Sequence, residues 1–280
     1  MGTAPPEGAR SAGRGRGSLR RARLASFAAV FEHLAVERDG EVAVVRIDRP
    51  PANALDLTLL SEGRRCVQEL AAAPPGAVVL TGRDGFFSAG MDLKVAPALG
   101  PQGQRDAVAG INALFAAWYA FPRPVVAAVN GHAIAGGLIL ALCADYRVGT
   151  TGPGRYGLTE LKVGFPYPAV AMAVVRAELS PAAARKLALR AHLIDAAQAA
   201  EIGLLDELVE GDPLPRAMAL ARELAQLPAN AYEQTKRQLR AETIAAAAEL
   251  VGSGDPLLGG WLGEEAAQAA GDALRAAGEC

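Results

Sequence analysis

Two glycine-containing segments of this sequence could bind a negative charge without an ionisable side chain. One is residues 135–137 (Ala-Gly-Gly), and the other is residues 86–94, which include Ser-Ala-Gly-Met-Asp. A glycine turn that leads into a helix leaves backbone N–H groups unpaired at the positive end of the helix dipole. Two such turns that converge can hold one developing oxyanion, and each donor then stabilises a transition state by about 2.7–4 kcal/mol.

Buried strands must bring these two turns together. Residues 77–80 and 125–129 are short, fully apolar runs, which predicts strands buried on both faces. Each glycine segment follows one of these runs, so both turns could lie at one edge of an open sheet, where such folds bind ligands. Strands that alternate with helices predict the α/β class. The further elements expected are a hairpin of residues 34–38 and 41–47, helices over 56–70 and 106–121, and a strand at 146–148.

The remainder of the chain reads mostly as helix. Residues 205–209 are the one late strand, and no internal repeat is visible, so we expect a change of architecture near residue 200. The helices after residue 213 look amphipathic but have no evident partner within the domain. The predicted helices cover residues 166–178, 181–190, 195–203, 213–227, 229–250 and 262–277.

Composition excludes several classes of protein. The chain has 280 residues, of which 51% are apolar and 21% charged, as expected for a soluble globular protein. A formal net charge of −2 gives no reason to expect attraction to nucleic acid or anionic lipid. The longest apolar runs are too short for membrane insertion. Three scattered cysteines fit a reducing compartment, and no cysteine or histidine has a neighbour at metal-ligand spacing, so we expect no metal site.

The N-terminal segment, residues 1–26, is rich in arginine and glycine, and its composition predicts disorder. A mitochondrial presequence and an RNA-contacting arm are two interpretations. A third is a coding bias towards arginine together with an over-called start codon, because only 4 of the 28 basic residues are lysine. We therefore expect a bacterial cytoplasmic protein, with the mitochondrial matrix as the alternative.

From about residue 33 to the C-terminal helix, the sequence resembles the crotonases, the enoyl-CoA hydratase/isomerase superfamily. Residues 49–55 look like the family's first CoA-contacting loop, and residues 87–93 look like its first oxyanion loop. Residues 130–137 and 143–147 look like two parts of its second oxyanion segment. Residues 156–160 look like its catalytic-glutamate segment, and residues 199–206 look like the turn into its trimerising helices.

The resemblance implies the overall organisation of the molecule. It predicts a crotonase-like spiral of ββα units with a C-terminal helical trimerisation region. On this interpretation residues 1–26 are a tail, residues 27–200 form the α/β core with the acyl-CoA site, and residues 201–280 form the oligomerisation region. The expected partners are an acyl-CoA thioester and further copies of the chain, as a homotrimer or a dimer of trimers.

The same resemblance assigns catalysis to three positions. The N–H groups of Met91 and Gly136 are the oxyanion donors, and Glu160 matches one of the two glutamates of family hydratases. The second glutamate would fall at Ile139, on the helix face shared with Gly136. This departure favours the pattern of Δ3-Δ2-enoyl-CoA isomerases, since one carboxylate can take a proton from C2 and return it at C4. Hydrocarbon from Ile139 would also raise the pKa of Glu160.

Further positions are expected to contact the substrate. Lys94 could meet CoA phosphates or be an ordinary surface lysine, Asp92 is expected to cap its own loop, and aromatic residues from 156 to 168 could form the acyl pocket wall. No separate cofactor is expected, since CoA is part of the substrate. The expected substrate-binding residues are Ala52, Ala54, Ala89, Gly90, Asp92, Leu93, Lys94, Gly137, Ile139 and Phe165.

Three other functions fit the same residues. One is hydration of a 2-enoyl-CoA with a single glutamate. Another is a different reaction through an enolate, such as decarboxylation or thioester hydrolysis. The third is a CoA-thioester-binding protein that retains the oxyanion site without turnover, which the missing second carboxylate favours.

Overall fold

The computed structural model describes residues 1–2, 30–83, 85–95, 99–261, 263, 266, 268–269, 271–272 and 275. The expectations for the arginine-rich segment 1–26 therefore fall almost entirely outside the described residues. Most of the helix predicted over 262–277 also lies outside them. None of the described helices is long and apolar enough to cross a lipid bilayer.

The larger sheet contains a hairpin followed by parallel strands, and helices cover both of its faces. Its first two strands are antiparallel, as the predicted hairpin requires, and every later neighbour pairs in parallel. The two fully apolar runs are its central strands, and all of their residues are buried. In spatial order the sheet consists of β1 (Leu34–Asp39), β2 (Val42–Ile47), β3 (Ala77–Thr81), β5 (Val125–Val129), β7 (Tyr146–Thr150) and β9 (Glu207–Val209).

A second, much smaller sheet stands at the carboxyl ends of the central strands. Its parallel strands are β4 (Phe86–Ser88), β6 (His132–Ile134) and β8 (Tyr156–Gly157). Each follows one strand of the larger sheet, namely β3, β5 or β7. Each then leads towards a helical element: α2 (Pro101–Tyr119), α3 (Gly136–Leu142) or the 3-10 helix η2 (Glu160–Val163). The ββα repetition implied by the resemblance is therefore present in the fold, although no sequence repeat reveals it.

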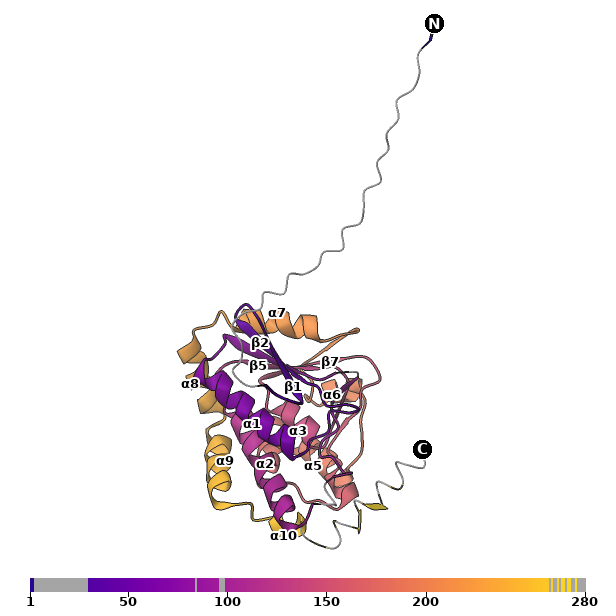
Figure 1. Cartoon of the computed structure of the whole chain (residues 1–280), viewed down its shortest axis with the longest axis vertical. Helices are drawn as coiled ribbons and strands as arrows, with labels where there is room; N and C mark the ends of the chain where they lie inside the picture. The colour runs from indigo at the N-terminus through magenta and orange to yellow at the C-terminus, as the bar shows by residue number, and fades with distance from the viewer. Residues whose placement is uncertain are drawn as a thin grey trace.

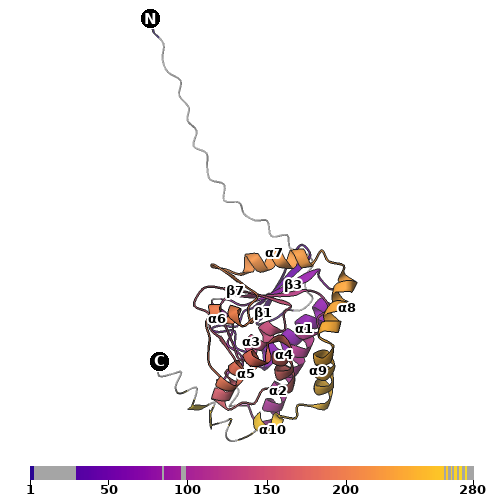
Figure 2. The ribbon, with the colours of Figure 1, turned by 180° about the vertical axis from the view of Figure 1, so that it is seen from behind.

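The larger sheet separates two apolar cores. On one face α7 (Leu214–Leu224) packs over β3 and β5, where Val79 and Val126 contact Ala217 and Ala221. On the opposite side lie α1 (Leu57–Ala72), α2 and α3 (Figures 1 and 2). Here the central strands contribute Val78 and Leu80, which pack with Phe115 and Trp118 of α2 in the main core. The site described below lies on this second side.

The helices after β8 differ in part from those predicted. The predicted helix 166–178 begins later, as α4 (Ala169–Glu178), because the prolines at 166 and 168 keep the preceding backbone extended. The late strand is shorter than predicted. The predicted helix 229–250 is two helices that meet at Arg240. The remaining described helices are α5 (Pro181–Arg190), α6 (Ala196–Glu201), α8 (Ala229–Leu239), α9 (Ala241–Ser253) and α10 (Leu258–Trp261).

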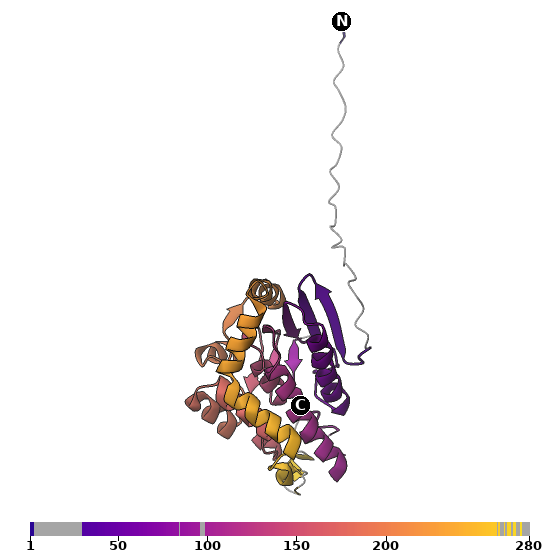
Figure 3. The same cartoon turned by 90° about the vertical axis from the view of Figure 1, so that its left-hand side faces the viewer.

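The C-terminal helices do have partners within the domain, so the expectation that they lack them is wrong. α9 packs along α2 and α4 (Figure 3). At the α8–α9 junction the buried Arg240 guanidinium donates hydrogen bonds to the carbonyls of Tyr119, Cys143 and Ala144, at 3.0, 3.1 and 3.0 Å. These carbonyls lie at the C-terminal ends of α2 and α3, where a cation also complements the helix dipole. Lys236 of α8 is buried beside Asp145, with 2.8 Å between Nζ and Oδ2.

Candidate active site

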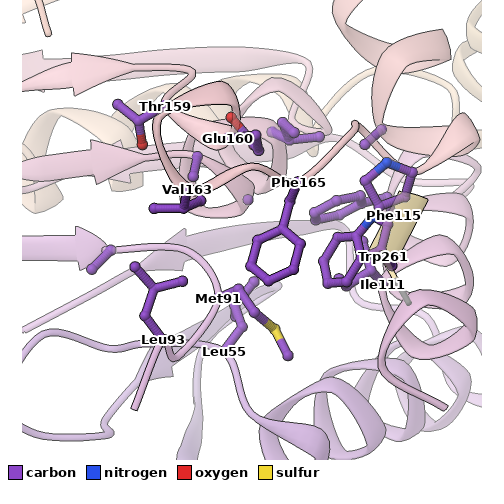
Figure 4. A pocket seen from close by; sticks show the side chains of 16 residues that line it. Leu55, Met91, Leu93, Ile111, Phe115, Thr159, Glu160, Val163, Phe165 and Trp261 are labelled. Carbon is purple, nitrogen blue, oxygen red and sulfur yellow. The ribbon is translucent and has the colours of Figure 1, made fainter. Parts of the chain in front are cut away.

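A cavity that is partly open to solvent lies where the three strands of the small sheet end. The loop after β4 brings Met91 to this cavity, the turn after β6 brings Gly136, and the segment after β8 brings Glu160 (Figure 4). The parallel register of the small sheet thus places all three predicted catalytic positions around one space. The described residues that line it are Leu55, Ala89, Met91, Leu93, Ile111, Phe115, Ala135, Gly136, Ile139, Thr159, Glu160, Val163, Phe165, Pro168, Ala171 and Trp261.

The loop after β4 is held against residues 52–55 by main-chain hydrogen bonds. The amide of Ala89 donates to Ala52 O at 3.0 Å, Leu55 N donates to Gly90 O at 2.7 Å, and Asp92 N donates to Leu55 O at 2.9 Å. The amide between them, that of Met91, has no acceptor among the described residues. A parallel bridge of this kind leaves the N–H of the central residue free, so the Met91 amide is available to a ligand.

The turn after β6 exposes a second amide. Ala135 begins α3 with a φ of 50°, and its N–H donates to Gly157 O at 2.8 Å. The first intrahelical bonds run to Ala135 O from residues 138 and 139, so the described structure offers the amide of Gly136 no acceptor. An alanine in this backbone region is strained, and such strain is concentrated at functional sites.

The two turns touch each other. Gly90 has a φ of 80°, and a Cβ atom there would lie 3.0 Å from the nitrogen of Gly136 and 2.8 Å from the Cβ of Ala135. A Cβ at Gly137 would lie 2.2 Å from Ser88 O, in the strand below. Only glycine fits either position without displacing backbone, so these two glycines allow α3 to approach the β4 loop closely.

Arg49 and Asn53 fix the loop beside Met91, and sequence reasoning did not identify either side chain. The Arg49 guanidinium donates to Asp56 Oδ2 at 2.9 Å and to Asp92 Oδ2 at 2.8 Å. Asn53 is fully buried, and its amide group donates to Phe86 O at 2.9 Å. Asp92 also accepts from Lys94 N at 3.0 Å, which fits the loop cap expected of it. The Arg-Pro-Pro motif marked this loop, but residue type alone does not say what a partly buried arginine binds.

Glu160 is the group that can carry a proton. Its side chain is 8% exposed, and Oε2 has no hydrogen-bond partner among the described residues. Burial raises the pKa of Glu160 from 4.5 to about 7, and nearby backbone amides and the Tyr167 phenol partly oppose this rise. A carboxyl group with this pKa is divided between its acid and base forms near neutral pH.

Of the other predicted positions, four line the cavity and six do not. Ile139 is buried and presents hydrocarbon to it, as expected, and Ala89, Leu93 and Phe165 line it as well. The remaining predicted substrate contacts, which do not line the cavity, are Ala52, Ala54, Gly90, Asp92, Lys94 and Gly137. The first five belong to the two joined loops at its edge, and Lys94 is exposed there.

Trp261 is a wall residue that sequence reasoning missed. It stacks on Phe165 with ring centroids 4.5 Å apart and lies about a hundred positions further along the chain. No local pattern connects two such residues. Within the described part of the chain, no three His, Cys, Asp or Glu side chains are grouped in a way that could hold a metal ion.

Comparison with known proteins gives a consistent result. Residues 37–252 match the model of the enoyl-CoA hydratase/isomerase family. A Thermus thermophilus protein that carries the name of an enoyl-CoA hydratase is 38% identical over 208 residues, which are 72% of this chain and 81% of that protein.

Solved structures agree in fold. A Mycobacterium tuberculosis protein described as an enoyl-CoA isomerase superposes with a TM-score of 0.71 at 28% identity, covering 79% of this chain and 98% of its own. Another structure of that mycobacterial protein is described as a probable enoyl-CoA hydratase. It has a TM-score of 0.73 at 28% identity and covers 79% of this chain and 94% of its own.

Proposed function

This chain belongs to the enoyl-CoA hydratase/isomerase family, and we propose that it moves the double bond of a 3-enoyl-CoA to the 2-position. Family membership places it among crotonase-type enzymes of acyl-CoA metabolism. The isomerase reaction is the more specific proposal, and it depends on the groups that line this cavity.

One observation carries the proposal: Glu160 is the only ionisable residue among the described residues of the cavity wall. The helix position that would hold a second carboxylate is Ile139. Addition of water to a double bond requires activation of the water and delivery of a proton to carbon, which two carboxylates can divide between them. Double-bond migration requires one group that takes a proton and returns it, and a single carboxylate is sufficient.

The proposed mechanism has two proton transfers and one enolate. Ionised Glu160 removes a proton from C2 of the 3-enoyl thioester, and the electron pair moves onto the thioester oxygen. The N–H groups of Met91 and Gly136 hold the resulting oxyanion. Protonated Glu160 then delivers the proton to C4, the electrons return from oxygen, and the double bond forms between C2 and C3. Its raised pKa suits a group that must act in both directions.

Hydration of a 2-enoyl-CoA is the second candidate function. The names carried by the relatives favour it, since both the Thermus protein and one description of the mycobacterial protein specify a hydratase. On this alternative Glu160 would activate the water and also supply the proton. The apolar wall at Ile139 gives that water no second carboxylate.

The experiment offers purified protein a 3-enoyl-CoA and, separately, a 2-enoyl-CoA, and follows the ultraviolet absorbance of the conjugated thioester. We expect gain of absorbance with the first substrate and little loss with the second. Fast loss with the 2-enoyl substrate would replace the isomerase proposal with the hydratase. A protein that binds both thioesters and turns over neither would be a binding protein. The variant Ile139→Glu supplies the missing carboxylate, and we expect it to gain hydration.

We also propose that no separate cofactor is used, because CoA is part of the substrate.

We further propose that the chain forms homotrimers or pairs of trimers. Apolar side chains exposed on the C-terminal helices support this proposal: Leu239 is 83% exposed and Val251 is 49% exposed. Sedimentation of the purified chain tests it.

A further inference from the structure

The cavity has two unlike sides. Figure 4 shows Leu93, Val163 and Thr159 on one side and Trp261, Phe115 and Ile111 on the other. Leu93 adjoins the exposed residues of the β4 loop, so this is the open side. On the other side, Ile111, Phe115 and Trp261 are each no more than 5% exposed, so that side is closed.

Trp261 completes the closed side from the C-terminal part of the chain. Its ring stacks on Phe165 with an interplanar angle of 21°, and its indole Nε1 donates to Pro166 O at 2.8 Å. A Cβ added to Gly260 would lie 2.7 Å from Pro166 Cγ, so α10 lies directly against this turn. The indole has one polar group and that group is paired, so the face towards the cavity is hydrocarbon.

Hydrogen bonds of Asp255 hold the segment 255–261 in place. Asp255, which precedes α10, accepts from Asn112 Nδ2 at 2.8 Å and from Ala169 N at 2.7 Å. Asn112 is 2% exposed, and its Oδ1 accepts from Val170 N at 3.1 Å. The first amides of α4 are therefore capped by side chains from α2 and from the loop before α10. The segment that carries the tryptophan is therefore fixed by hydrogen bonds between Asp255 and both α2 and α4.

We infer that Trp261 ends the acyl pocket and sets the length of the acyl chain that this protein accepts. The inference rests on the proposed function, because an acyl-CoA must occupy the cavity with its thioester between the turns at Met91 and Gly136. From that point an acyl chain extends towards Phe115, Ile111 and the indole. The ligand class is an unsubstituted aliphatic acyl group, since the described residues of the closed end offer no free polar group to a carboxylated or hydroxylated chain terminus.

The test compares Trp261→Ala, Trp261→Phe and Leu257→Ala with the original protein. Leu257 lies in the same segment, outside the cavity wall, and serves as the matched control. Dissociation constants are measured for saturated acyl-CoA thioesters of four, eight, twelve and sixteen carbons, and kcat/KM for 3-enoyl-CoA substrates of the same lengths. Circular dichroism and a melting curve establish that each variant folds. Trp261→Leu keeps an apolar side chain of intermediate size and replaces the alanine variant if the latter does not fold.

We expect Trp261→Ala to increase the affinity for twelve-carbon relative to four-carbon thioester at least about tenfold, because each buried methylene adds favourable transfer free energy. Trp261→Phe retains the stacked ring and should change the ratio little, and Leu257→Ala should not change it. A folded Trp261→Ala or Trp261→Leu protein with the original chain-length profile would overturn the inference, and so would an equal shift in Leu257→Ala.

The binding measurements separate this inference from the proposed reaction. If the affinity profile shifts in Trp261→Ala while no enoyl-CoA is isomerised, the inference holds and the isomerase proposal fails. If isomerisation proceeds and the profile stays unchanged, the isomerase proposal stands and Trp261 does not set chain length.

Discussion

The strands of the two sheets alternate along the chain from β3 to β8, but different contacts stabilise the two sheets. The central strands of the larger sheet have five buried residues each and are packed between α7 and the main core. The strands of the smaller sheet have only two or three residues. Close glycine contacts, the Arg49 and Asn53 hydrogen bonds and the pairing of two loops supplement this short ladder.

The larger sheet therefore contributes mainly to stability, and the smaller sheet mainly positions the predicted catalytic residues. The central strands of the larger sheet are buried between two apolar cores, whereas the smaller sheet places Met91, Gly136 and Glu160 around the cavity. Substitutions in the two regions should therefore change different measurements.

Glu160→Gln should have the largest effect. The amide is close in shape to the carboxyl group but cannot take the proton from C2, so we expect turnover to fall by about 10²–10⁴-fold. Binding of a saturated acyl-CoA should persist, because the oxyanion donors and the apolar wall are unchanged. Steady-state kinetics and calorimetric titration check both points. Full activity in this variant would show that another group is the base.

Gly90→Ala should be next, because its Cβ would displace the Gly136 amide, and loss of one such donor costs about 10²–10³-fold in turnover. Gly85→Ala is the matched control. Gly85 also has a positive φ, 78° against 80°, but no described atom lies within 4 Å of an added Cβ. The positive φ should destabilise both variants to a similar degree, and the close contacts around Gly90 add a further cost in that variant alone. Equal turnover in the two variants would argue that the contact between the turns is unimportant for catalysis.

A rise in pH should change kcat/KM and the free energy of unfolding in opposite directions. Proton removal requires ionised Glu160, so kcat/KM should rise as the pH increases through about 7. Stability should change in the opposite sense. Between about pH 4.5 and pH 7 the folded protein keeps a proton on Glu160 that the unfolded chain loses, so the free energy of unfolding falls as pH rises.

Urea unfolding at pH 5 and pH 8 measures this second effect. Relative to Glu160→Gln, the original protein should lose about 1–3 kcal/mol of unfolding free energy between these two pH values. A constant difference between the two proteins would mean that the carboxyl group is not desolvated in the folded state.

Val126→Ala should have the smallest effect on turnover. Val126 is fully buried in β5 on the α7 side of the larger sheet, away from the cavity. Removal of two methyl groups should lower the free energy of unfolding by about 2 kcal/mol. Chemical denaturation measures this loss, and turnover below the melting transition should be unchanged. A fall in turnover comparable with that of Gly90→Ala would remove the distinction between the two sheets.

The two sheets also differ in how far sequence reasoning could predict them. The apolar runs at 77–80 and 125–129 were predicted correctly, because a strand buried on both faces has a recognisable composition. The hairpin before them was also predicted correctly, from its apolar residues on either side of an Asp-Gly turn. β4, β6 and β8 were not predicted, since two or three residues give no periodicity to read. Their arrangement depends on tertiary contacts such as that between Gly137 and Ser88.

The site was accessible to sequence reasoning only where residue types are characteristic. The glycine turns and Glu160 were named, and the structure places them around one cavity, although their catalytic roles stay predictions. Arg49, Asn53 and Trp261 were missed because their importance lies in contacts with distant parts of the chain. The partners of the C-terminal helices were missed for the same reason, since Arg240 binds carbonyls about a hundred residues earlier.

Because Trp261 lies late in the chain, the cavity is closed only after the rest of its described wall has been synthesised. Every other described residue of the cavity wall lies between Leu55 and Ala171, and synthesis on the ribosome completes those positions first. Until residue 261 has emerged and Asp255 has met its helix partners, an apolar hollow in the nascent chain faces water. A late segment, residues 255–261, is therefore the one that covers this apolar surface and protects it from non-productive association.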